Sequence, residues 1–103
     1  MILLNTTYYV HVSCRAEFLA WVRSEYIAQA LQSGIFTDPL LLMVEHQMEP
    51  DALTYAVQMK AQNVAKAKEW HDCGDGLALR DVIMKRFPQK VLFFSSFMDI
   101  MPL

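Results

Sequence analysis

Long apolar runs and cysteines are scarce in this 103-residue sequence, and each scarcity excludes a class of protein. No apolar stretch approaches the roughly 20 residues that a membrane-spanning helix needs. The apolar residues after Met1 give way to Asn5 without a basic segment, so no signal peptide is expected. Cys14 and Cys73 are too few for a disulfide framework. Reduced thiols fit a cytoplasmic protein, which is the expected location.

Positive charge is also in short supply. Nine Lys and Arg residues face eleven Asp and Glu residues, and the formal net charge is −2. A dedicated nucleic-acid binder usually carries a basic face, because neutralising phosphates supplies much of its affinity. The sequence therefore predicts no nucleic-acid partner.

Apolar residues, by contrast, are abundant. They make up 54% of the chain and charged residues 19%, a composition that excludes disorder. The length suits one domain over residues 1–103. A domain of this size has much surface relative to its volume, so part of the apolar material is expected to be buried against a partner.

Four segments are predicted to be strands. Residues 2–12 are rich in β-branched and aromatic side chains, and they alternate between an apolar and an amphipathic face. Residues 53–61 alternate as clearly. Residues 40–48 and 91–100 are apolar on both faces, which is typical of strands covered on both sides. Residues 49–51 predict a turn between the second and third strands.

Two segments are predicted to be helices. The first is expected to begin with Ser13 as its N-cap and to end at Gly34, with Trp21 off its buried side, either partly exposed or covered from outside the core. That buried side is predicted to consist of Leu19, Val22, Tyr26 and Ala30. The second is expected to start after Asn63 and to stop before Pro88. It should break near residues 73–76, with Asp75 capping the new start.

This order predicts an α+β fold of the ferredoxin-like type, with two helices on one face of a four-stranded antiparallel sheet. The other face is left open, and stacking two such faces would give a symmetric dimer, the dimeric α/β-barrel arrangement. The residues predicted to line this dimer face or a ligand pocket on it are Asn5, Thr7, Tyr9, His11, Met43, Gln58, Phe93, Ser95 and Phe97.

Several short motifs carry a resemblance to a known family. They are residues 5–8, 17–21, 25–27, 33–36, 54–58, 86–87 and 91–94. Together they resemble a family of short bacterial proteins with a domain-of-unknown-function label (DUF4286-like). The resemblance implies a ferredoxin-like fold and dimerisation, and it supplies no activity.

The sequence also contains zinc-ligand residue types, in His11 with Cys14 and in His71 with Cys73. Two helical positions two residues apart point about 200° away from each other, so the spacing is poor and no metal is expected. Cys14 near a helix N-terminus, with His11 as a base, would suit a nucleophile. A third group to orient them is missing from the pattern, so an ordinary thiol is favoured.

Two functions therefore remain open. The first is a homodimeric small-molecule-binding or protein-interaction module with no cofactor. The alternative is an enzyme of the dimeric α/β-barrel type, resembling monooxygenases or isomerases, that acts on a small apolar or aromatic substrate at the open face. A heme- or flavin-using protein would belong to this second class, and it rests on analogy between folds.

Overall fold

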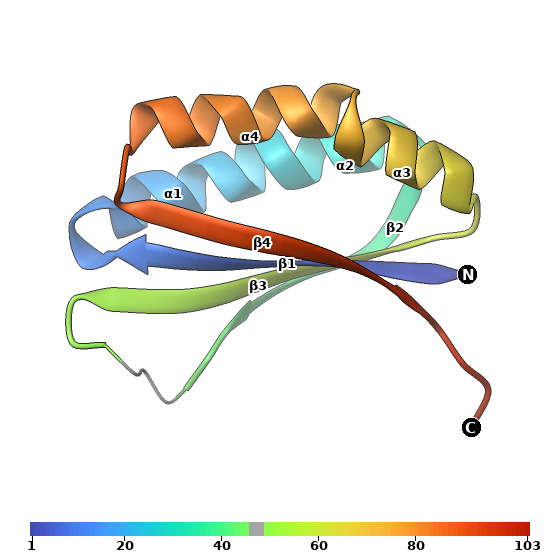
Figure 1. Cartoon of the computed structure of the whole chain (residues 1–103), viewed down its shortest axis with the longest axis horizontal. Helices are drawn as coiled ribbons and strands as arrows, with labels where there is room; N and C mark the ends of the chain where they lie inside the picture. Colours follow the sequence, from blue (N-terminus) through green and yellow to red (C-terminus); the bar gives the residue numbers. More distant parts are fainter. Residues whose placement is uncertain (46–48) are drawn as a thin grey trace.

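The computed structural model describes residues 1–45 and 49–103, and it confirms the ferredoxin-like α+β fold. One antiparallel sheet has the strand order β2-β3-β1-β4. Its strands are β1 (Ile2–His11), β2 (Phe36–Met43), β3 (Ala52–Ala61) and β4 (Val91–Asp99). The helices cover one face of the sheet and leave the other open (Figure 1). In the part of the chain that the structure describes, no helix is both long and apolar enough to cross a membrane.

The first helical layer consists of η1 (Val12–Cys14), α1 (Arg15–Trp21), η2 (Val22–Ile27) and α2 (Ala28–Gln32). The sequence had predicted Ser13 as the N-cap of this layer, and this prediction was wrong. The chain enters a 3₁₀ turn directly after β1, and the imidazole of His11 accepts the Ser13 N–H at 3.1 Å. Gly34 ends the layer at φ 75°, as predicted.

Trp21 is 1% exposed and lies in the core, so the expectation that it sits off the buried side was wrong. The reason is η2, a π-helical segment that turns less per residue than an α-helix. It keeps Phe18, Val22 and Tyr26 on the sheet side together with Trp21, whose indole stacks on the Tyr26 ring at 5.5 Å.

The second helical layer consists of α3 (Val64–Asp72) and α4 (Asp75–Arg86). Asn63 caps α3 as predicted, because its side-chain oxygen accepts the Lys66 N–H at 3.0 Å. The predicted break is present, but Gly74 rather than Asp75 is the N-cap of α4. A Cβ at Gly74 would lie 3.1 Å from the Trp70 Cα, so the close packing of the two helices favours glycine there.

Strand β2 begins earlier than predicted, at Phe36, and residues 46–48 of the predicted strand lie outside the described residues. Its pairing with β3 steps from Thr37↔Lys60 to Leu40↔Gln58, so Asp38 and Pro39 together oppose one residue. This is a β-bulge, and Asp38 adopts φ 53° within it. The bulge inverts which side chains of β2 face the helices.

Candidate functional site

The face of the sheet opposite the helices, named here the open face, is defined by the register of the strands. Side chains directly opposite each other in neighbouring strands share a face. The cross-strand partners of the alternate β1 residues therefore belong to it. The open face comprises Leu3, Asn5, Thr7, Tyr9, His11, Thr37, Leu40, Leu42, Ala52, Thr54, Ala56, Gln58, Lys60, Leu92, Phe94, Ser96 and Met98.

Large apolar side chains on the open face lie mainly on the two edge strands. Leu40 and Leu42 come from β2, whereas Leu92, Phe94 and Met98 come from β4. Together with Tyr9 on β1, each is between 41% and 56% exposed. Scattered apolar residues are normal on a protein surface, but a shared face with six of them is typical of an interface.

The middle of the open face is polar. Asn5 donates a hydrogen bond to the Thr7 hydroxyl at 3.2 Å, and Gln58 donates to the Asn5 side-chain oxygen at 3.3 Å. All three side chains are partly buried by their neighbours. The open face thus consists of a hydrogen-bonded centre between two apolar margins.

Four residues predicted on the open face lie on the other side of the sheet. Phe93 pairs with Tyr8 and Ser95 with Thr6, so both face the helices. Phe97, opposite Leu4, also points to the helical side, where its ring meets the His71 ring at 5.3 Å. Met43 pairs with Tyr55 and therefore also lies on the helical side of the sheet.

The physical cause differs between the two strands. β4 is apolar on both faces, so alternation alone did not specify which residues point outward. In β2 the bulge at Asp38 and Pro39 shifts the alternation by one residue. Sequence reasoning consequently missed Leu40, Leu42, Leu92, Phe94, Ser96 and Met98, whereas Asn5, Thr7, Tyr9, His11 and Gln58 lie on the open face as placed.

A second group of polar residues lies between the sheet and the helices, and no local pattern of the sequence indicates it. This inner polar cluster, as it is named here, comprises Thr6, Tyr8, Tyr26, His71, Arg80 and Ser95. The hydroxyls of Thr6 and Ser95 lie 2.8 Å apart. Arg80 hydrogen-bonds the His71 ring nitrogen Nδ1 and the His71 carbonyl oxygen, both at 2.7 Å.

The thiol of Cys14 lacks the surroundings of a nucleophile. Burial raises its pKa, with Lys90 nearby opposing the shift, and the thiol donates to the His11 carbonyl at 3.3 Å. The His11 imidazole is occupied by the Ser13 hydroxyl at 2.7 Å and the Ser13 N–H. Among the described residues, no three His, Cys, Asp or Glu side chains lie close enough to hold a metal ion.

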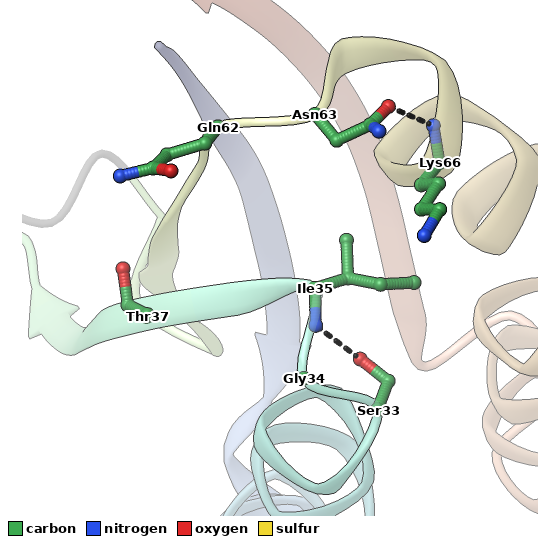
Figure 2. Close-up of a pocket in the computed structure, with 7 residues that line it drawn as sticks. All are labelled: Ser33, Gly34, Ile35, Thr37, Gln62, Asn63 and Lys66. Carbon is green, nitrogen blue, oxygen red and sulfur yellow. Dashed lines mark hydrogen bonds between the residues drawn. The ribbon is translucent and has the colours of Figure 1, made fainter.

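A surface hollow of about 400 Å³ lies where the α2–β2 and β3–α3 connections meet (Figure 2). Its polar groups serve local structure. The Ser33 hydroxyl accepts the Ile35 N–H at 3.1 Å, and Asn63 caps α3 through Lys66. The hollow is therefore accounted for by two chain reversals.

Solved structures with this fold include proteins of very different sequence. An antibiotic biosynthesis monooxygenase matches with a TM-score of 0.69 and 15% identity, over 99% of this chain and 100% of that one. HapK from Hahella chejuensis matches with a TM-score of 0.67 and 10% identity, over 98% and 93% of the two chains. A dimeric ferredoxin-like protein from an uncultured marine organism matches with a TM-score of 0.61 and 15% identity, over 98% of this chain and 96% of that one. At such identities the likeness shows the fold alone.

Sequence comparison gives a narrower answer. No curated protein matches the chain. A family model does match, over residues 1–101, and its description is "Domain of unknown function (DUF4286)". The chain belongs to this family.

Proposed function

We propose that this protein is a homodimeric binding module whose two subunits stack through their open faces. The observation that carries the proposal is the pair of apolar margins, in which six large side chains are between 41% and 56% exposed. Water contact with such a surface is unfavourable, and a second copy of the same face removes it.

The open face is suited to pairing with itself. In a twofold dimer the same patch meets itself, so it must carry little net charge. Lys60 is the one Lys, Arg, Asp or Glu among the open-face residues defined above, and it lies near one end of the sheet. Stacked sheets pack about 10 Å apart, which lets apolar side chains from both margins interdigitate.

The size of the face supports the same arrangement. Four strands about 4.8 Å apart and roughly 30 Å long give a projected area of about 600 Å². A typical stable interface buries about 800 Å² of accessible surface per partner, and accessible surface exceeds projected area. The dimeric ferredoxin-like protein from an uncultured marine organism, which shares this fold, supports the same association. Two free thiols, Cys14 and Cys73, fit the reducing cytoplasm in which we place the dimer.

The alternative, an enzyme working at the open face, has less support. Its central polar groups, Asn5, Thr7 and Gln58, hydrogen-bond one another. An amide or a hydroxyl that is occupied in this way is a poor acid or base. Any small ligand at this face would be held between the two sheets, with the apolar margins closing around it.

Light scattering coupled to size exclusion tests the dimer. The expected mass is about twice the 11.9 kDa of one chain, and it should fall toward one chain on dilution. A chain that stays monomeric at high concentration would defeat the proposal.

A further inference from the structure

The inner polar cluster contains two buried phenols whose hydrogen bonding is incomplete. Tyr8 and Tyr26 are fully buried, and neither hydroxyl makes a hydrogen bond of good geometry with any described residue. Burial raises the pKa of both phenols. The two hydroxyls interact with each other, the Tyr26 hydroxyl also interacts with that of Thr6, and Arg80 opposes the shift in each case. Buried hydroxyls nearly always make well-formed hydrogen bonds, so two neighbouring ones that lack such a bond call for a physical explanation.

The guanidinium of Arg80 is also incompletely matched. It is 8% exposed, and within the described chain no carboxylate lies within 4.0 Å of it. Its two hydrogen bonds go to His71, leaving further N–H donors of the five that a guanidinium carries. A buried cation normally has an anionic partner, because removing it from water is costly.

The backbone gives a third observation. Tyr26 lies in η2, the π-helical segment, and π turns within helices are frequent at functional sites. Apolar and aromatic rings complete the surroundings: Trp21 stacks on Tyr26, while Phe93 packs on Tyr8 with ring centroids 5.8 Å apart.

We infer that the inner polar cluster is a binding site for a small aromatic carboxylate. The carboxylate would accept hydrogen bonds from Arg80 and from the phenolic O–H groups of Tyr8 and Tyr26. Its ring would pack among the aromatic side chains that line this layer. The inference rests on the proposed role as a binding module and assigns the ligand's class, and it does not require the dimer.

The ligand reaches the cluster from the β4 edge of the sheet. Ser95 and Phe97 on this edge strand are half-buried, whereas Thr6 and Tyr8 on the neighbouring strand are fully buried.

Isothermal titration of the full chain with phenylacetate tests the inference, with Trp21 and Trp70 fluorescence as a second readout. Phenylacetate should bind saturably, while its neutral isostere phenylacetamide should bind at least about tenfold more weakly, because it lacks the charge that Arg80 recognises. Inorganic phosphate is the third probe. Phosphate binding as tight as that of phenylacetate would overturn the assigned ligand class.

Variants locate the site. Tyr26→Phe should weaken phenylacetate binding about tenfold or more. It should also raise the melting temperature of the ligand-free protein, because it removes an unpaired buried hydroxyl. Tyr55→Phe, which removes a buried phenolic hydroxyl outside the inner polar cluster, is the matched control and should leave phenylacetate binding unchanged. Arg80→Gln should abolish binding, whereas Arg86→Gln on the same helix, at an exposed position, should not.

Three results would overturn the inference: no saturable binding of phenylacetate, equal binding by the Tyr26→Phe and Tyr55→Phe proteins, or a lower melting temperature in Tyr26→Phe. The Tyr26 variant stays informative even if Arg80→Gln does not fold. Light scattering on the same samples separates the two proposals. A dimer without binding defeats only the ligand site, and binding by a monomer defeats only the dimer.

Discussion

Replacing Phe94 by Glu should convert the dimer into folded monomers. Phe94 is 52% exposed on the open face, and its ring lies 6.3 Å from that of Tyr9. A phenylalanine presents about 200 Å² in all, so roughly 100 Å² per subunit remains for the partner to bury. At about 25 cal/mol per Å², this contributes about 2.5 kcal/mol per subunit.

The twofold axis doubles that value, because each dimer contains the contact twice. A loss of about 5 kcal/mol raises the dissociation constant by between three and four orders of magnitude. The buried charge of Glu adds to the effect, since no cation of the open face other than Lys60 could pair with it.

Analytical ultracentrifugation over a dilution series measures this change, with circular dichroism to confirm the fold. Val82→Glu is the matched control, because Val82 is 41% exposed on α4 and lies on the helical side of the molecule. It should dimerise as the wild type does. Phe93→Glu, one residue away, should instead unfold the chain, because Phe93 packs on Tyr8. A Phe94→Glu protein that dimerises as tightly as the wild type would refute the reasoning.

Two further predictions concern stability. Burial and the neighbouring Arg80 lower the pKa of His71 from 6.5, while Asp72 opposes this shift. Below pH 6.5 the unfolded chain therefore binds a proton that the folded chain excludes. The stability that His71 contributes should thus be fully present above about pH 6.5 and be lost as the pH falls toward the folded pKa. In His71→Asn the unfolding free energy should depend less steeply on pH over this range. Denaturant titrations that give the same pH dependence for both proteins would contradict this. Gly76→Ala should cost about 1–3 kcal/mol, because its Cβ would lie 2.8 Å from Trp70. Leu77→Ala, at an exposed neighbour, is the control in thermal unfolding, and equal melting temperatures would refute the clash.

Strands that alternate strictly could be placed from the sequence, and strands that are apolar on both faces could not. The β1 pattern put Asn5, Thr7 and Tyr9 on the open face, and the structure agrees. In β4 both Phe93 and Phe94 are aromatic, and only pairing with β1 decides which one faces outward. Such information is non-local, because it depends on a partner strand some 80 residues earlier in the chain.

The inner polar cluster escaped prediction for a related reason. Arg80 lies beside Leu79 in a helical pattern, where a charged residue is ordinarily assigned to solvent. Arg80 is nevertheless buried, and it hydrogen-bonds His71 across the break between α3 and α4, with Tyr26 near it in the π-helical segment. Both features depend on tertiary packing, which no local pattern contains.

The bulge in β2 limits how another sheet could pair with this edge. β2 is an edge strand, and an edge with free N–H and C=O groups invites another sheet to add on indefinitely. Pro39 has no N–H to offer, and Asp38 at φ 53° bends the strand beside it. Growth of a continuous sheet along the β2 edge is therefore disfavoured, which under the proposed function leaves the open face as the surface through which a second copy would pair.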